Sequence, residues 1–365
     1  MWRALCFRCV GRNVIGWQAW NSAVGQGQPV RRFVRRQLSE PQHRSLRPVR
    51  DVECSSRGST GLLRPLAFAV TVTGASYTIA AVWQYETFRR LAKPNQHRFS
   101  QDRNFYGKAG DFRHQLNAWW NSLYPTEKLV CGIIGVNAAV FVAWRFLPQF
   151  SVFMAKYFMA SPMAQATCWP MLLCTFSHYN FFHLFVNMYV LWSFAPVASN
   201  KFGKEQFLAT YVSAGVIASF ASYVYNVVRG SMLPSLGASG AIMALIGIVG
   251  TSFPDTRLQI AFVSKIFPHS FSADSGVKGL IAFDMLGMVL GWRFLDHAGH
   301  LGGMLFGIWY AKYGHQIAKR YRERVVQHWH NLRGKPWSVL TSYCICLALR
   351  VPDHLSQVAL VWNWL

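Results

Sequence analysis

The sequence predicts an all-α, polytopic membrane protein, and three observations support that class. Of the 365 residues, 52% are hydrophobic and only 14% are charged. Asp, Glu, Lys and Arg are all absent between Tyr157 and Asn200, and again between Gly230 and Pro254. Several apolar stretches approach the roughly 20 residues that a helix needs to cross a bilayer. A chain of this length would otherwise suggest two or three soluble domains, which charge-free stretches of this size exclude.

Residues 1–64 are predicted to be a mitochondrial presequence and a disordered basic arm. They contain twelve Arg, no Lys and three acidic residues, the first of which is Glu40. An Arg-rich, acid-poor segment without a continuous apolar core is typical of mitochondrial import rather than secretion. The alternative is a basic arm that binds nucleic acid or anionic lipid. The presequence is preferred because membrane spans follow, so the net charge of +23 serves targeting and topology, and no nucleic-acid partner is expected.

Seven apolar stretches are predicted to span the bilayer, as one detached helix followed by six. The extra helix covers 65–83, and a polar connecting segment follows at 84–125. The six-helix core covers 126–314, and 315–365 is a tail that is basic and then atypically apolar. The core spans are expected at about Leu129–Leu147, Met171–Phe194, Gln206–Val228, Leu233–Phe253, Val277–Trp292 and Ala298–Tyr313.

The connection between the first two core spans carries a stripe of large apolar residues. Aromatic and Met side chains recur at i, i+3, i+4, i+7 and i+8 from Phe150 to Phe158. Such a stripe fits an amphipathic helix in the membrane interface. It also fits a loop packed against its own bundle, and the two alternatives stay open.

The eight cysteines predict no metal site and no disulfide framework. Cys6 and Cys9 form a C-x-x-C pair, but it lies in the predicted presequence and has no second pair at zinc-finger spacing. The cysteines in or near the spans are expected to be buried apolar fillers.

Polar side chains inside three spans stand out, because a polar group in the bilayer is costly and usually serves a function. His183 and Asn187, four residues apart, lie on one helical face with Asn180. A later span carries Ser239, and the last span carries His300. Small residues accompany both: Gly237, Gly240, Gly303 and Gly307. The glycines that follow His300 share its face, so a neighbouring backbone can approach closely.

These residue types suit serine-protease chemistry. A serine hydroxyl becomes a good nucleophile when an imidazole takes its proton, and the oxyanion formed on attack needs preorganised donors. Ser239 and His300 would form the dyad, while His183, Asn187 and backbone N–H groups near Ser239 would be the donors. A dyad without a buried acid would avoid the cost of an unpaired carboxylate in the bilayer.

The order of the motifs H-x-x-x-N, G-A-S-G and H-L-G-G-x-x-x-G resembles that of the rhomboid intramembrane serine proteases, in particular their mitochondrial branch. The likeness runs from the detached helix to about residue 335, and it implies a rhomboid-type six-helix bundle plus one N-terminal transmembrane helix. It implies Ser239 as nucleophile, His300 as general base, and His183 with Asn187 as the oxyanion pair. It makes Phe150–Phe158 the membrane-submerged first loop. Close packing at the site would involve Gly237, Gly240, Gly303 and Gly307.

Two features depart from the family pattern. Many rhomboids have a tyrosine four residues after the serine, stacked on the histidine, whereas this chain has Met243. A thioether can still pack on an imidazole, although less rigidly. The segment Pro336–Leu365 is unlike the mitochondrial branch, as an alternative exon or read-through would explain, and no catalytic role is expected for it.

Other polar residues near the spans receive structural roles. Asp284 lies mid-span, but an intramembrane aspartyl protease needs a second carboxylate that shares its proton. The other spans offer none, so Asp284 is expected to form a hydrogen bond within the bundle. His178 is on a different face from His183 and is expected to tie down a loop. For His297, a spectator role at the helix entrance and a role at the site stay equally open.

The resemblance implies a serine endopeptidase, multi-pass in the mitochondrial inner membrane. It would hydrolyse peptide bonds in or near the transmembrane helices of single-span proteins, with a role in mitochondrial quality control, mitophagy and apoptosis. The expected partners are these substrates, the lipid bilayer and a membrane protein complex. No metal, other cofactor or nucleic acid is expected.

Two rival classes remain for comparison. A catalytically inactive rhomboid-like adaptor would bind helices without cutting them, but it need not keep Ser239 and His300. A transporter would favour inverted repeats or paired half-helices, and the sequence shows none. The orientation stays open, because loop charge places the 84–125 segment in the matrix, whereas a stop at the detached helix during import places it in the intermembrane space.

Overall fold

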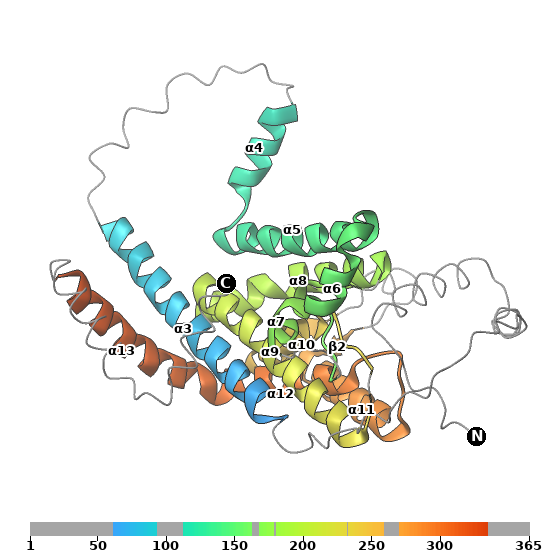
Figure 1. Cartoon of the computed structure of the whole chain (residues 1–365). Helices are drawn as coiled ribbons and strands as arrows, with labels where there is room; N and C mark the ends of the chain where they lie inside the picture. The colour runs from blue at the N-terminus through green and yellow to red at the C-terminus, as the bar shows by residue number, and fades with distance from the viewer. Residues whose placement is uncertain are drawn as a thin grey trace, which may run out of the picture.

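The computed structural model describes residues 61–92, 112–162, 168–178, 180–231, 233–258 and 270–334. Most of the predicted presequence, part of the polar connecting segment and the atypical tail lie outside these residues. The described chain is helical almost throughout (Figure 1), which confirms the all-α class.

The long helices follow one another along the chain. They are α3 (Leu63–Ala92), α4 (Phe112–Ser122), α5 (Pro125–Phe146), α8 (Phe181–Phe202), α9 (Lys204–Arg229), α10 (Ser239–Ser252), α11 (Ala273–Leu290), α12 (His297–Trp309) and α13 (His315–Arg333). Short elements connect them: η1 (Pro148–Phe150), α6 (Ser151–Tyr157), α7 (Cys168–Leu173), η2 (Cys174–Phe176), the antiparallel pair β1 (Arg257–Leu258) and β2 (Phe271–Ser272), and the π-helical turn η3 (Tyr310–Gly314).

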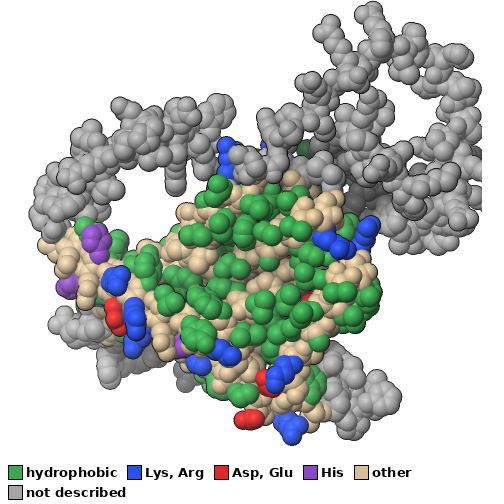
Figure 2. All heavy atoms as spheres, turned by 90° about the horizontal axis from the view of Figure 1, so that it is seen from below, with side chains coloured by type: hydrophobic (Ala, Val, Ile, Leu, Met, Phe, Trp, Pro, Cys, Tyr) green, Lys and Arg blue, Asp and Glu red, His purple; other side chains and the backbone are tan. Residues whose placement is uncertain are grey.

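The described helices confirm a polytopic membrane protein. Four of them, α3, α5, α8 and α9, are long and apolar enough to cross a membrane, and α10 is apolar but shorter. Large apolar side chains also cover much of the face drawn in Figure 2, and exposed fractions reach 77% at Val228 and 78% at Val289. So much exposed apolar surface suits a lipid environment rather than water. The predicted count of one plus six spans stays a prediction.

Helix α9 is the centre of the bundle. It packs against α3, α8, α10 and α12. Many of its buried residues are small, namely Ala209, Ser213, Ala214, Gly215, Ala218, Ser219 and Ser222. Membrane helices gain little from hydrophobic burial against one another, so small residues that allow close backbone approach become the main packing device.

The predicted span Met171–Phe194 is wrong at its start. The apolar run at 171–176 forms the end of α7 and the 3-10 turn η2, and α8 begins only at Phe181. Asn180 caps α8, because its side-chain oxygen accepts the His183 N–H at 2.8 Å. A capping residue ends the preceding segment whatever its hydropathy, so an apolar run alone could not locate this boundary.

The span predicted from Leu233 also begins later, because α10 starts at Ser239 itself. The preceding segment is irregular and pairs with the first loop. The N–H of Ala160 donates to the Ser235 carbonyl at 3.0 Å, and the N–H of Ser235 donates to the Ala160 carbonyl at 2.8 Å. Ser239 therefore lies at a helix N-terminus that the first loop helps to position.

The apolar stripe in the first loop forms the short helix α6. Met154 is 4% exposed and faces the bundle, whereas Phe150 and Phe153 are about half exposed. Helix α6 also contacts α7. The stripe thus packs against its own bundle on one side and presents aromatic rings outward on the other, which is consistent with both alternatives.

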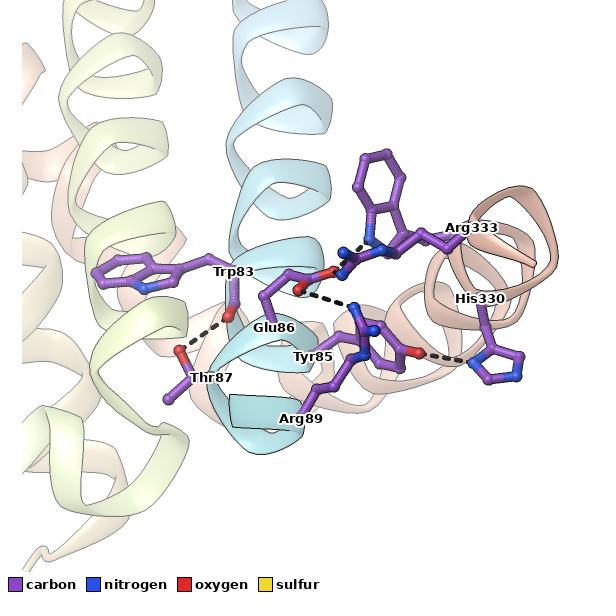
Figure 3. Close-up of polar contacts among 8 residues, drawn as sticks. Trp83, Tyr85, Glu86, Thr87, Arg89, His330 and Arg333 are labelled. Atoms are coloured by element: carbon purple, nitrogen blue, oxygen red, sulfur yellow. Dashed lines mark hydrogen bonds and ion pairs between the residues drawn. The ribbon is translucent and has the colours of Figure 1, made fainter. Parts of the chain in front are cut away.

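Helix α3, the first of the described helices, lies beside α13 along one edge of the molecule (Figure 1) and also packs on α9. Polar contacts join α3 to α13 near the end of α3 (Figure 3). Glu86 accepts from the Trp329 indole at 2.9 Å and pairs with Arg333, and the Tyr85 hydroxyl lies 2.6 Å from His330 Nδ1. Part of the predicted basic tail is therefore a helix attached to the fold.

Candidate active site

The loop before Ser239 is held by hydrogen bonds on several sides. The N–H of Gly237 donates to the Cys174 carbonyl at 2.9 Å, and the N–H of Ala238 donates to His178 Nε2 at 3.4 Å. His178 is 3% exposed. The predicted role of His178 in tying down a loop is therefore confirmed, and the loop is the one that leads into the serine.

Gly237 combines a backbone conformation and a close contact that a residue with a side chain could not have. Its φ is +133°, which L side chains rarely adopt, and an added Cβ would lie 2.9 Å from His183 Cε1. The imidazole of His183 thus packs directly against the backbone just before Ser239. This contact brings α8 to the start of α10.

The N-terminus of α12 is anchored to the same loop. Asp296 caps α12 by accepting the Gly299 N–H at 3.0 Å, and its carboxylate also accepts the Ser235 hydroxyl. His300 follows in the first turn, with its N–H bonded to the Asp296 carbonyl at 2.9 Å. The cap therefore fixes His300 relative to the segment that carries Ser239.

Ser239 and His300 form a hydrogen-bonded pair. Ser239 Oγ lies 2.8 Å from His300 Nε2, and His300 is 6% exposed. A hydroxyl and an imidazole at this distance can exchange a proton. The pair joins two helices whose starts are separated by 58 residues of chain, 297 − 239.

The predicted close packing of α10 on α12 involves the glycines next to the dyad. A Cβ at Gly303 would overlap the Gly240 carbonyl, and a Cβ at Gly307 would overlap the Ala244 carbonyl. A Cβ at Gly240 would overlap Ala218 of α9. The three helices thus meet at contacts that only glycine permits.

The other predicted donors lie on the first turns of α8. Asn187 is 6% exposed, and its amide donates to the His183 carbonyl at 2.8 Å. An Asn amide carries two N–H donors, and this bond uses one of them. His183 lies against Gly237, while Asn187 lies one turn further along the same helix.

A small cleft opens at the dyad. Its volume is about 20 Å³, and it is lined by residues from α9, the serine loop, α10 and α12, including Ser219, Ser235, Gly237, Ser239, Asp296 and His300. A cleft of this size excludes an intact helix, whose diameter with side chains is about 10–12 Å. Among the described residues, no group of three His, Cys, Asp or Glu side chains could hold a metal ion.

A buried carboxylate lies near the dyad, at a place that sequence reasoning did not predict. Asp284 of α11 is 1% exposed, and its Oδ1 lies 2.8 Å from His297 Nδ1 and 3.5 Å from His300 Nδ1. The expectation that Asp284 forms a hydrogen bond within the bundle is confirmed. Its proximity to His300 was not expected, although a mid-span Asp together with a histidine three residues before His300 was a usable signal.

Met243, which stands where many rhomboids have tyrosine, lies one turn after Ser239 on α10 and is half-buried. Each predicted site residue is thus described, and together they come from α8, the serine loop, α10 and α12.

The site thus consists of a serine and a histidine from two helices of a membrane bundle, at the start of a glycine-packed helix pair. A family model described as the rhomboid domain matches residues 165–317. The presenilin-associated rhomboid-like protein, mitochondrial, of Homo sapiens is 46% identical over 275 residues, which cover 74% of this chain and 72% of that protein. The chain therefore belongs to the rhomboid family.

More distant relatives extend the comparison. Rhomboid protein 1, mitochondrial, of Saccharomyces cerevisiae is 29% identical over 225 residues, covering 61% of this chain and 63% of the yeast protein. Rhomboid protease GluP of Bacillus subtilis is 31% identical over 152 residues, covering 41% of this chain and 27% of the bacterial protein. The similarity thus reaches one protein that is described as a protease.

Proposed function

We propose that the chain is an intramembrane serine endopeptidase of mitochondria. Membership of the rhomboid family, the protease among its relatives and the mitochondrial relatives support the general role. The observation that carries the chemistry is the 2.8 Å contact between Ser239 Oγ and His300 Nε2. The inner membrane is the proposed location, with the catalytic dyad inside the bundle.

In the proposed mechanism, Ser239 Oγ attacks the scissile carbonyl carbon while its proton moves to His300 Nε2. The tetrahedral intermediate collapses when His300 gives that proton to the leaving amine, and an acyl-enzyme on Ser239 remains. Water then attacks the ester, with His300 again taking and returning a proton, and the free enzyme is restored. The reaction needs no cofactor.

The oxyanion would be stabilised by donors near the start of α10. The N–H groups of a first helical turn have no acceptor within the helix, and the helix dipole makes this end partly positive. Because α10 begins at Ser239, these N–H groups lie next to the attacking oxygen. His183 and the second N–H of the Asn187 amide would add side-chain donors, each of the kind that contributes about 10²–10³ in rate.

The proposed substrates are single-span membrane proteins. Their transmembrane helix would have to unwind near helix-breaking residues, because the cleft beside Ser239 is too small for a folded helix. By the family resemblance, such cleavage would serve mitochondrial quality control, mitophagy and apoptosis. The bilayer is the medium in which enzyme and substrate meet, and a membrane protein complex is a further proposed partner.

Cleavage of a single-span model protein by the reconstituted chain tests this proposal. Wild type is expected to release a product, whereas Ser239→Ala should lower the rate by at least about 10³-fold. Ser193→Ala is the matched control, because Ser193 is exposed on α8 and, within the described part of the chain, its hydroxyl donates to the Tyr189 carbonyl of the same helix. Equal product from wild type and Ser239→Ala would overturn the protease proposal, and binding without cleavage would favour the adaptor.

A further inference from the structure

The carboxylate of Asp284 lies between two histidines, on the side of His300 that faces away from Ser239. Its Oδ1 is 2.8 Å from His297 Nδ1 and 3.5 Å from His300 Nδ1, and the opposite nitrogen of His300 faces Ser239 at 2.8 Å. The carboxylate and the two imidazoles are nearly inaccessible, with exposed fractions of 1% for Asp284, 3% for His297 and 6% for His300. The four side chains therefore form a continuous series from α11 through α12 to α10.

His300 needs an acceptor on the side where Asp284 lies. To take the serine proton, Nε2 must be unprotonated, so the neutral ring carries its hydrogen on Nδ1. Among the described residues, His300 Nδ1 is a buried atom without a hydrogen-bond partner. A separation of 3.5 Å is long for an N–H···O bond, but catalytic hydrogen bonds often tighten only when substrate is bound.

The surroundings hold Asp284 and His297 as one unit. Gly287, one turn after Asp284 on α11, leaves room for the His297 ring, since a Cβ there would lie 2.5 Å from His297 Nε2. Three aromatic rings surround the same imidazole with centroids 5.4–5.9 Å away, those of Phe283, Trp292 and Phe294. A buried carboxylate is costly unless it is hydrogen-bonded, and His297 supplies that bond.

We propose that Asp284 is a positioning residue for His300, held in place by His297. This inference rests on the proposed function. Asp284 would select the tautomer of His300 that carries hydrogen on Nδ1 and would stabilise the imidazolium formed when Nε2 takes the Ser239 proton. The carboxylate stays ionised throughout, and the proton stays on His300 until the leaving amine receives it. The lone pairs of Oδ1 allow it to serve both histidines.

The test compares the full-length reconstituted chain with Asp284→Asn, which keeps the size and removes the charge. The kcat for a single-span model substrate is expected to fall about 10- to 100-fold while KM stays within about twofold, since binding contacts are unchanged. The rate of Ser239 labelling by a fluorophosphonate should fall in parallel, measured per folded molecule. Asp284→Glu should recover part of the loss. Asp274→Asn is the control, because Asp274 is a partly exposed carboxylate on the same helix, paired with Lys278.

A double mutant separates positioning from general destabilisation. If Asp284 acts through His300, the slow residual rate of Ser239 labelling in His300→Ala, followed over a long incubation, should not fall further when Asp284→Asn is added. Multiplicative losses would overturn the inference, as would a wild-type kcat in Asp284→Asn.

Should Asp284→Asn fail to fold, His297→Asn replaces it. The same loss of kcat at constant KM supports the inference, and an unchanged kcat overturns it. A wild-type chain that is inert in both assays overturns the proposed function and this inference together, whereas an active wild type matched by Asp284→Asn overturns this inference alone.

Discussion

At the scale of single residues, Gly303 sets the distance between the two members of the dyad. Its missing side chain lets α12 lie against the Gly240 carbonyl of α10, one residue after Ser239. Because protein interiors are close-packed, an extra methyl group here has no free space and must move a backbone. The 2.8 Å contact between Ser239 and His300 therefore depends on a residue that takes no part in the chemistry.

Gly303→Ala should separate α10 from α12. Forcing a methyl group into a packed contact costs about 1–3 kcal/mol, and the displaced dyad should cleave at least about tenfold more slowly. Thermal unfolding and cleavage of a single-span substrate measure both effects. Gly279→Ala is the control, because a Cβ there meets nothing within 4 Å. An active Gly303→Ala variant with a wild-type melting temperature would contradict the account.

At the scale of elements, the start of α8 determines where His183 lies. Asn180 has extended backbone angles, φ −145° and ψ 173°, and its side chain accepts the His183 N–H. The cap therefore ends the irregular segment and orients the first turn of the helix in one step. His183 then meets Gly237 at the loop that leads into Ser239.

Asn180→Ala should weaken this cap and loosen His183. The expected loss of stability is about 0.5–2 kcal/mol, and the cleavage rate should fall by up to about tenfold, a part of what an oxyanion donor provides. Asn180→Asp keeps an accepting oxygen and should stay close to wild type. If Asn180→Ala and Asn180→Asp behave alike in both unfolding and cleavage, the cap does not position His183.

Several neighbours of Ser239 could be identified in the sequence, namely His183, His300 and the close-packed glycines, whereas the start of α8 and the place of Asp284 could not. Ser239 and His300 could be found because polar residues are rare in apolar spans and their neighbours are small. The start of α8 could not be found from hydropathy, because the buried apolar run before it forms a short helix and a turn. The contact between Asp284 and His300 depends on how α11 and α12 rotate against each other, which spacing within one helix does not determine.

At the scale of the whole molecule, α3 and α13 pack against each other at the edge of the bundle. They lie far apart in sequence yet side by side, and α3 also packs along the central helix α9. Besides the contacts of Glu86 and Tyr85, Arg322 donates to Gln84 at 3.0 Å, and the Thr78 and Tyr321 hydroxyls are 2.8 Å apart. Helix α3 thus holds α13, the segment that follows α12 and η3.

Glu86→Ala should loosen the C-terminal end of α13 without altering the dyad. The substitution removes the acceptor shared by Trp329 and Arg333 (Figure 3), so trypsin should cut the basic residues of α13 faster. Fluorophosphonate labelling of Ser239 should stay within about twofold of wild type, because the local opening does not reach the core. Glu323→Ala, an exposed acid on α13 itself, is the control. Proteolysis as slow as in wild type would show that Glu86 does not hold α13.

The central claim is that His300 activates Ser239 as the nucleophile. Mass-spectrometric mapping of the fluorophosphonate adduct on the reconstituted chain tests it most directly. The account predicts an adduct on Ser239 in wild type and its near-complete loss in His300→Ala, since an unassisted serine hydroxyl is a weak nucleophile. An adduct at another residue, or labelling of Ser239 that persists in His300→Ala, would contradict it.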